Sequence, residues 1–173
     1  MTDALRALIR DVPDYPRPGI MFKDITPLLG DPRSFRAACE AMAESFRSDG
    51  ITHVAAIESR GFLFGAPVAI SLNAAVVPIR KRGKLPYHAE FEEYELEYGT
   101  DSLEMHVDAL PADARVLVVD DVLATGGTAA AACRLVERLH GQVVGCSFLI
   151  RLTFLKGLQK LETKKVSTII TFD

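Results

Sequence analysis

The sequence lacks an apolar run long enough to cross a bilayer, and its N-terminus carries acidic residues and no apolar signal segment. A membrane-spanning helix needs about 20 consecutive apolar residues. A secretory signal needs an apolar core behind a basic start. We therefore expect a protein that stays in the cytosol.

Cysteine is scarce, and the three present, Cys39, Cys133 and Cys146, are far apart and have apolar neighbours. An odd count with this spacing argues against a disulfide framework. Neither the cysteines nor the four histidines show the spacing of zinc ligands. The sequence thus predicts reduced thiols in the core and no zinc site.

An excess of positive charge is also missing, since 20 Lys and Arg face 23 Asp and Glu, giving a net charge of −3 and a pI near 5.8. Nonspecific nucleic-acid binding needs a basic face, so this composition disfavours it. At 173 residues and 49% hydrophobic, without repeats or linkers, the chain is expected to form one domain, residues 1–173.

Two familiar phosphate-binding motifs are absent, because the chain contains neither a Gly-Lys-Thr loop nor G-x-G-x-x-G. ATP hydrolysis and dinucleotide binding are therefore disfavoured. What the chain has instead is VVDDVLATGGT, residues 118–128, between an apolar, β-branched run and an alanine-rich stretch. The two glycines let backbone N–H groups approach an anion, the following helix start attracts negative charge, and two threonines add donors. The segment predicts a phosphate cradle.

Asp120 and Asp121 directly precede this cradle. They suit acceptors for the 2- and 3-hydroxyls of a ribose, or for the water shell of Mg²⁺ on a diphosphate. Alone, the pair could simply end a strand and cap a helix. Response-regulator pockets and aspartyl phosphatases also place acids at a strand end, but neither requires the ATGGT that follows. The whole string therefore favours a phosphorylated sugar.

Strands and helices alternate through most of the chain. We expect strands at 54–57, 75–79, 116–119 and 143–150, and helices at 62–72 and 129–140. This alternation predicts an α/β fold with a mostly parallel twisted sheet flanked by helices, and ligands at the carboxyl ends of the strands. Residues 58–61 and 120–128 both follow such ends.

Two further segments interrupt the alternation. Residues 1–33 begin with an expected helix whose face is Leu5, Leu8, Ile9 and Val12, and then run through prolines to Asp31, the expected N-cap of a second helix that ends at Gly50. Residues 80–107 are charged and then alternate, which predicts a two-stranded arm with a mobile tip. A loop of this length in a compact domain is usually functional.

These motifs together resemble a known family. The string at 118–128 resembles the phosphoribosyl-diphosphate motif of type I phosphoribosyltransferases. Five further segments resemble the adenine-specific branch of that family: DYPRPGIMFKDITPLL (14–29), ESRGFLFG (58–65), RKRGKLP (80–86), ELEYG (95–99) and LTFLKG (152–157). The resemblance implies the type I phosphoribosyltransferase fold, with 1–33 as a base-covering hood and 80–107 as a flexible lid. The lid would keep water from an oxocarbenium-like transition state.

The resemblance also implies a reaction. Phosphoribose would pass from 5-phospho-α-D-ribose 1-diphosphate, here phosphoribosyl diphosphate, to N9 of adenine, giving AMP and diphosphate in purine salvage. Mg²⁺ would be the cofactor, held mainly by the substrate, with a water-mediated contact to Asp120 left open. The partners would be adenine, phosphoribosyl diphosphate, AMP and a second copy of the chain in a homodimer.

Site residues follow from the same resemblance. The 5-phosphate would be held by Ala124, Thr125, Gly126, Gly127 and Thr128, and the ribose hydroxyls by Asp120 and Asp121. Ser59, Arg60 and Lys84 would bind the leaving diphosphate, with Arg60 and Lys84 also counted as catalytic. Arg60 could instead form a surface salt bridge, and Arg80, Lys81 and Arg82 could equally be a solvated cluster or an interface patch.

Glu97 is the implied acid/base residue, placed to accept the N7 proton of adenine while N9 attacks, with Tyr98 steering the lid. The competing interpretation is that Glu97 is one more solvated member of an acidic stretch. Adenine itself would stack between Phe22 and Leu155, and backbone groups around Lys23 would recognise its exocyclic amine and N1. For Phe22 and Leu155 the alternative is ordinary core packing.

Two rival functions stay open. The first is a regulator that senses phosphoribosyl diphosphate, but such proteins need a nucleic-acid module or a basic face. The second is an enzyme of the same fold that accepts xanthine, hypoxanthine or orotate. The FKDI, ESRGFLFG and LTFLKG segments disfavour this second function, because those acceptors go with different base-covering segments.

Overall fold

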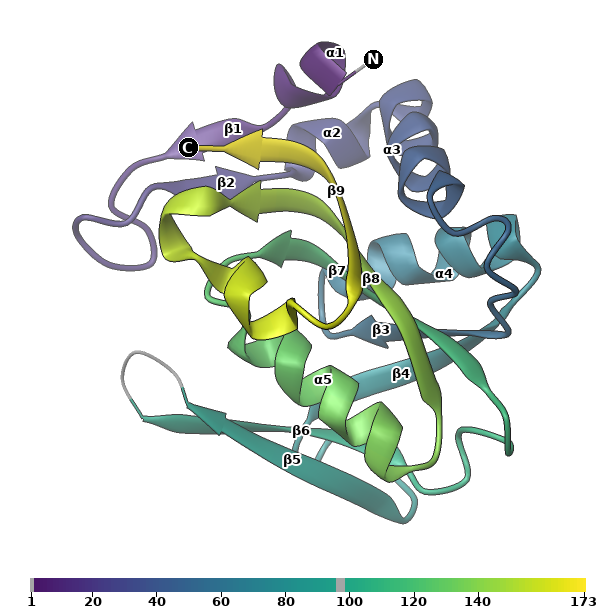
Figure 1. Ribbon diagram of the computed structural model, residues 1–173. Coiled ribbons are helices and arrows are strands. Elements are labelled where there is room, and N and C mark those ends of the chain that lie inside the picture. The colour runs from purple at the N-terminus through teal and green to yellow at the C-terminus, as the bar shows by residue number, and fades with distance from the viewer. Residues whose placement is uncertain (1, 96–98) are drawn as a thin grey trace.

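A computed structural model describes residues 2–95 and 99–173 (Figure 1). Its main sheet has seven strands in the order β5-β6-β4-β3-β7-β8-β9. The parallel strands are β3 (His53–Ile57), β4 (Ala75–Lys81), β7 (Arg115–Leu123), β8 (Gln142–Leu152) and β9 (Lys165–Phe172). The antiparallel ones are β5 (Ala89–Glu95) and β6 (Thr100–His106). The expected mostly parallel sheet is confirmed.

The order of the parallel strands determines where a ligand can bind. Helix α4 (Gly61–Leu72) connects β3 to β4, and helix α5 (Gly127–Arg138) connects β7 to β8 on the other side of the sheet. The chain thus winds outward in both directions from β3 and β7. In open α/β sheets the crevice at this point, beyond the carboxyl ends of the strands, is where ligands bind.

Each face of the sheet has its own apolar core. On one face, Ala129–Ala132 and Leu135 of α5 pack on Val116, Val118 and Phe148, with the 3₁₀ helix η2 (Gly157–Leu161) at the edge. On the other, α3 (Pro32–Glu44) and α4 pack Met42, Phe64 and Val68 against Leu117 and Leu149. These side chains are almost fully buried, and each of them larger than alanine contributes roughly 1.5–3 kcal/mol by leaving water.

The N-terminal prediction was partly wrong. Helix α1 (Thr2–Arg6) ends early, and residues Arg10–Val12 form strand β1, which pairs antiparallel with β2 (Phe22–Asp24). A helix of twelve residues or fewer is marginal on its own, so backbone pairing with β2 prevails. Leu5 and Ile9 are nevertheless buried, as the predicted apolar face required.

The second helix begins as expected and ends sooner. Asp31 caps α3 by accepting a 2.8 Å hydrogen bond from the Ser34 N–H, and Pro32 occupies the first turn. The helix stops at Glu44, short of Gly50, which has φ +62°. Four further elements were not predicted from the sequence: α2 (Thr26–Gly30), the 3₁₀ turn η1 (Thr153–Leu155), η2 and β9.

Strands β5 and β6 form the expected two-stranded arm, paired from Ala89↔His106 to Glu95↔Thr100. The arm joins the sheet only where Arg80 and Lys81 of β4 pair with β6. It also docks on α5, because Arg134 Nε lies 2.5 Å from Glu92 Oε1 and Arg138 Nη1 lies 3.2 Å from Glu90 Oε1. Residues 96–98 lie outside the described residues, so the expected mobile tip stays a prediction.

The N-terminal segment packs against β9. Arg6 donates a 2.6 Å hydrogen bond to the Thr171 carbonyl, and its guanidinium lies 4.6 Å from the centre of the Phe172 ring. The Lys23 ammonium lies 4.2 Å from the same ring. No helix in residues 2–95 and 99–173 has both the length and the apolar character needed to cross a bilayer.

Candidate active site

The first wall of the site is the turn between β3 and α4. Residues Glu58, Ser59 and Arg60 make this turn, and the Glu58–Ser59 peptide bond is cis. Gly61 then starts α4 directly against the end of β7. A Cβ atom at Gly61 would lie 2.8 Å from Asp120 Oδ1 and 3.1 Å from the Val119 carbonyl oxygen. Only glycine lets this turn lie against the acid pair without displacing it.

Glu58 organises the cations around this turn. Its side chain is only 7% exposed, and Oε2 accepts hydrogen bonds from Arg80 Nε at 3.1 Å and from the Lys81 backbone N–H at 2.8 Å. Oε1 pairs with the Lys84 ammonium. Burial would raise the pKa of Glu58, but Lys84, the Lys81 N–H and Arg80 outweigh it and the pKa is lowered. Glu58 is therefore a carboxylate that collects positive charge at the cavity wall.

Asp120 and Asp121 form the floor of the site at the end of β7. The Asp121 N–H donates to Asp120 Oδ1 at 2.9 Å, and Arg60 Nε lies 2.8 Å from Asp121 Oδ2. Burial, together with repulsion from Asp121, raises the pKa of Asp120 well above its usual value. Burial also raises the pKa of Asp121, although Arg60 opposes this. Asp121 Oδ2 is buried, and the described residues offer it no hydrogen-bond donor of suitable geometry.

The predicted phosphate cradle is a small pocket of its own. Residues from Ala124 to Ala129 and the end of β7 enclose about 70 Å³ at the start of α5. Gly126 has φ +75°, and a Cβ atom there would overlap the backbone of Gly157. The loop is thus held tight against Gly157 of the LTFLKG segment, and the pocket lies at the N-terminus of α5. An anion is the ligand that such a pocket favours.

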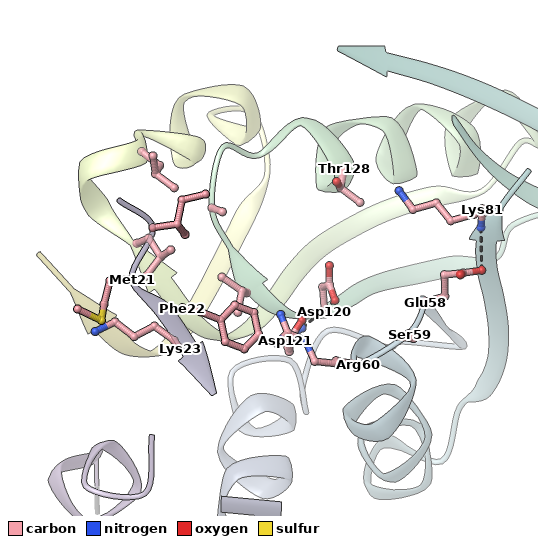
Figure 2. Close-up of a pocket in the computed structure, with 15 residues that line it drawn as sticks. Met21, Phe22, Lys23, Glu58, Ser59, Arg60, Lys81, Asp120, Asp121 and Thr128 are labelled. Atoms are coloured by element: carbon pink, nitrogen blue, oxygen red, sulfur yellow. Dashed lines mark hydrogen bonds and ion pairs between the residues drawn. The ribbon is translucent and has the colours of Figure 1, made fainter. Parts of the chain in front are cut away.

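Phe22 forms the opposite wall (Figure 2). Its ring meets the Tyr15 ring edge-on at 5.1 Å, and the Arg60 guanidinium lies 4.9 Å from its centre. Arg60 therefore links Asp121 to the aromatic wall. The Lys23 ammonium pairs with Asp11 at 2.5 Å and its side chain is 12% exposed. The Lys23 side chain is consequently engaged in an ion pair within the β1–β2 hairpin.

A cavity of about 480 Å³ joins these parts. Figure 2 shows the acid pair between Phe22 on one side and Glu58 and Lys81 on the other. The predicted site residues that line it are Phe22, Lys23, Ser59, Arg60, Asp120, Asp121, Ala124, Thr128 and Leu155. Thr125 and Gly126 line the adjoining phosphate pocket, and Gly127 begins α5. Lys84 reaches the cavity wall through Glu58. Glu97 and Tyr98 lie outside the described residues.

Several lining residues were missing from the predicted site: Ile20, Met21, Glu58, Lys81, Val122 and Leu152. Lys81 stood in the basic cluster whose role was left open. Its ammonium donates to the Tyr94 hydroxyl at 2.6 Å and pairs with Asp101. Burial would lower the pKa of Lys81, but Asp101 and Tyr94 outweigh it and the pKa is raised. Lys81 thus stays charged inside the cavity.

The other two cations of that cluster point elsewhere. Arg80 is held by Glu58 and by the Lys84 carbonyl at 3.2 Å. Arg82 lies over the Phe91 ring at 3.9 Å, with Glu93 4.0 Å away, and so belongs to the arm. Within residues 2–95 and 99–173, no cluster of three or more His, Cys, Asp or Glu side chains could hold a metal ion.

Comparisons with known proteins agree on one group. Residues 26–171 match the family model described as "Phosphoribosyl transferase domain". An adenine phosphoribosyltransferase of Myxococcus xanthus is 56% identical over 168 residues, which is 97% of this chain and 91% of that protein.

Solved structures give the same result. The adenine phosphoribosyltransferase of Rhodothermus marinus superposes with a TM-score of 0.95 at 54% identity, covering 99% of this chain and 98% of that one. The Saccharomyces cerevisiae enzyme, solved in complex with an imino-altritol bisphosphate and adenine, gives 0.92 at 39% identity and covers 98% of each chain.

Proposed function

The chain belongs to the phosphoribosyltransferases, and within them to the adenine phosphoribosyltransferases, and from this premise we infer what each part of its site does. The reaction is the transfer of phosphoribose from phosphoribosyl diphosphate to N9 of adenine, which yields AMP and diphosphate in purine salvage. One observation carries the assignment of roles: a single cavity is lined by an aromatic wall, an acid pair and a cationic turn, and it adjoins the phosphate pocket.

The ribose 5-phosphate occupies the pocket formed by Ala124, Thr125, Gly126, Gly127 and Thr128. Its negative charge suits the start of α5, and the αL conformation of Gly126 turns the loop so that successive amides face the anion. The ribose hydroxyls donate to Asp120 and Asp121. Both acids line the cavity, and Arg60 Nε lies 2.8 Å from Asp121 Oδ2 without the geometry of a hydrogen bond, which supports this role.

The leaving diphosphate binds where Ser59, Arg60 and Lys84 converge. Both cations are already paired, Arg60 with Asp121 and Lys84 with Glu58. The diphosphate must therefore share or replace these carboxylates, and the cations need no reorganisation to reach it. Charge placed in advance where charge develops lowers the barrier most effectively. Arg60 and Lys84 thus act in binding and in stabilising the departing group.

Adenine lies between Phe22 and Leu155. The two side chains line the same cavity from β2 and η1, which supports stacking rather than core packing. The Lys23 side chain is paired with Asp11, so its backbone is the part available for reading the exocyclic amine and N1. A site that hydrogen-bonds its substrate rejects a base with the wrong donor pattern, because a buried polar group would stay unpaired.

Glu97 is retained as the proton acceptor at N7, and Tyr98 as the residue that steers the lid. Both lie outside the described residues, so their support is the ELEYG segment at the end of the arm. Strand β5 docks on Arg134 and Arg138 near the C-terminal end of α5, and its own end lies beside the phosphate loop, where a Cβ atom at Gly127 would be 3.3 Å from the Glu95 carbonyl oxygen. We also propose that residues 80–107 form the lid and residues 1–33 the hood of one domain, residues 1–173.

Mg²⁺ is the proposed cofactor. The acid pair fits it, since carboxylate oxygens are the ligands that this ion prefers and Asp120 and Asp121 both line the cavity. When bound, the ion would offset the charge of the diphosphate. Two carboxylates are too few to enclose it, so the substrate would hold most of its coordination sphere, with Asp120 contacting it through water.

A homodimer is proposed from the outer surface of α4. This helix has no charged residue, and Leu63 and Ile70, seven positions apart, are 45% and 81% exposed. An apolar face of this kind usually marks an interaction site, and a second copy is the partner that most soluble oligomers use. We place the protein in the cytosol, where the three unbonded cysteines would stay reduced.

The test is AMP formation from phosphoribosyl diphosphate and Mg²⁺ with adenine, hypoxanthine, guanine, xanthine and orotate offered separately. Turnover confined to adenine is expected. Turnover of another base would refute the roles of Phe22, Lys23 and Leu155 and keep the phosphate pocket. Binding of phosphoribosyl diphosphate without transfer to any base would instead favour a regulator.

A further inference from the structure

Glu104 is a buried acid that the site described above does not use. It lies on β6, where Leu103 and Met105 face the core, so its place in the alternation predicts an outward, solvated side chain. The structure instead leaves it 6% exposed. Acids are almost never this buried without partners, and the partners of Glu104 are therefore informative.

Three consecutive backbone N–H groups donate to its carboxylate. Gly83 donates to Oε2 at 3.0 Å, while Lys84 and Leu85 donate to Oε1 at 2.8 and 2.6 Å. Successive amides that converge in this way form an anion-binding nest. The positive φ of Gly83, +82°, turns the backbone so that the amides converge. The anion in this nest is the protein's own side chain.

Glu104 is charged in this position. Burial would raise the pKa of Glu104, but the amides of Gly83, Leu85 and Lys84 and the nearby His106 outweigh it, and the pKa is lowered. The hydrogen bonds are thus charge-assisted, which makes them about twice as strong as neutral ones. A backbone segment held by three such bonds has little freedom to move away from β6.

The segment held by Glu104 carries Lys84, whose ammonium reaches Glu58 at the cavity wall. Lys84 is thereby fixed at both ends, by Glu104 at its backbone N–H and by Glu58 at its side chain. The Lys84 carbonyl also accepts from Arg80. Glu104 does not line the cavity itself, so any effect it has on the reaction must pass through this segment.

We propose that Glu104 is a positioning residue of the transfer reaction, whose carboxylate holds the backbone of residues 83–85 so that Lys84 is presented to the leaving diphosphate. The inference rests on the proposed role of Lys84. Because the cation is placed before substrate binds, less ordering remains to be done on binding, and the interaction is correspondingly stronger.

The test is Glu104→Gln, which keeps the shape of the side chain and replaces one acceptor oxygen with an NH₂ group that faces an N–H donor. We expect KM for phosphoribosyl diphosphate to rise about tenfold, a usual effect of removing a group that orients a ligand-binding residue, while KM for adenine changes less than twofold. Glu93→Gln, an exposed glutamate of the same arm, is the matched control and should leave both values unchanged.

Coupling to Lys84 separates positioning from general damage. Lys84→Ala should raise the same KM, and Glu104→Gln added to it should cause less than a twofold further change. Independent, multiplying effects would overturn the inference. An equal rise in both KM values for Glu104→Gln would also overturn it, since that is what a structural defect produces.

Hydrogen exchange provides a readout that does not depend on activity. The amides of residues 83–85 should exchange slowly in the free protein and at least tenfold faster in Glu104→Gln. Faster exchange with an unchanged KM for phosphoribosyl diphosphate would keep the nest and overturn its role in positioning. If the unaltered protein transferred nothing to adenine, the proposed function would fail, whereas an unaltered KM in Lys84→Ala would overturn the inference and the role of Lys84 while leaving the transfer reaction standing.

Discussion

At the scale of single residues, the contribution of an acid to the stability of the fold depends on pH. This dependence has one sign for the neighbouring acids Asp120 and Asp121 of the site and the opposite sign for the ion-paired acids of the arm. The pKa of Asp120 is raised by burial and by Asp121, so the folded protein binds more protons there than the unfolded chain. Its contribution to stability is therefore present at low pH and is lost as pH rises through the raised pKa. Asp101, paired with Lys81, has a lowered pKa and the opposite dependence.

Asp120→Asn should consequently make the protein more stable and less active. The amide cannot ionise, so the gain in Tm over the unaltered protein should be near zero at pH 3 and should grow as the pH rises to 8. Loss of one charged acceptor for ribose should lower kcat/KM by roughly 10- to 100-fold, as for other hydrogen bonds to charged groups. Thermal unfolding across this pH range and AMP formation at neutral pH measure the two effects.

Asp101→Asn is the control for this change. It removes a carboxylate whose pKa is lowered, despite burial, by Lys81 and the Ser102 N–H, so Tm should fall at pH 8 and recover its usual value at low pH. If Asp120→Asn and Asp101→Asn changed Tm at pH 8 in the same direction relative to the unaltered protein, the assignment of opposite pKa shifts would be contradicted.

Gly61→Ala tests the contact between the cationic turn and the acid pair. The added methyl would meet Asp120 Oδ1 and backbone of β7, and such overpacking costs typically 1–3 kcal/mol. We expect a Tm lower by several degrees and a kcat/KM for phosphoribosyl diphosphate reduced at least tenfold. Gly30→Ala, in α2, meets no atom within 4 Å and should change neither. An active, stable Gly61→Ala protein would show that the turn can shift freely.

The residues found from sequence were those whose role follows from a local motif. The phosphate loop, the acid pair and Arg60 stand beside glycines and strand ends that reveal them. Glu58 and Glu104 were not singled out, because their partners lie 22–26 and 19–21 positions away along the chain. Nothing in the spacing of an acid predicts which distant amides will point at it.

At the scale of elements, the arm is held to α5 by charge at its exposed edge and by Tyr94, Leu103 and Met105 in the core that it shares with α5. Arg138 contacts Glu90 and Glu92 and donates to the Phe91 carbonyl at 2.7 Å, while Arg134 pairs with Glu92. These arginines are almost half exposed, so each pair is worth little alone and is screened by salt. The docked position of the arm is therefore sensitive to ionic strength.

Arg138→Ala should loosen the arm without unfolding the protein. Chymotrypsin cleavage after Phe91 or Tyr94 should accelerate several-fold relative to the unaltered protein, and 0.5 M salt should reduce that difference. Tm should change by only a few degrees. Arg36→Ala, an exposed arginine of α3, is the control. Equal cleavage rates in both variants would argue that backbone pairing with β6 alone holds β5.

The boundaries of β3 were predicted to within one residue, whereas the predicted end of β7 at Val119 was wrong, because the strand continues through the acid pair to Leu123. The apolar runs of β3 and β7 leave little alternative to a central strand. The helix expected through Val12 failed because Arg10–Val12 finds a partner in β2, and pairing of that kind is decided by tertiary contacts. β9 was not identified, as its partly buried, mixed residues give no clear period.

At the scale of the whole molecule, the exposed apolar surface of α4 has no explanation in a single copy of the chain. If a second copy covers it, Ile70→Glu should convert the dimer to a monomer in sedimentation or light-scattering measurements, because an unpaired carboxylate in an apolar interface is strongly unfavourable. Val107→Glu places the same charge at another exposed apolar position, 46% exposed, and should leave the dimer intact. A monomeric unaltered protein would contradict the proposal.

The overall fold could be predicted because alternating strands and helices admit few arrangements. The two motif segments, 58–61 and 120–128, accordingly lie next to each other, because β3 and β7 are neighbours at the point where the strand order reverses. The hood was less accessible to prediction. Its position depends on the packing of β1, β2 and β9 together. The sequence pattern of each of these segments does not indicate that it will contact the other two.

The packing of the hood on β9 also determines when, during synthesis, the base site can be assembled. Arg6 bonds to Thr171 across 165 positions, and Lys23 rests on Phe172. A ribosome exposes the hood first and β9 long afterwards, since domains emerge from their N-terminal end at about 5–20 residues per second. The nascent chain can thus build its phosphate loop while Arg6 and Lys23 still lack their contacts on β9, and the proposed adenine site is unfinished until β9 has left the ribosome.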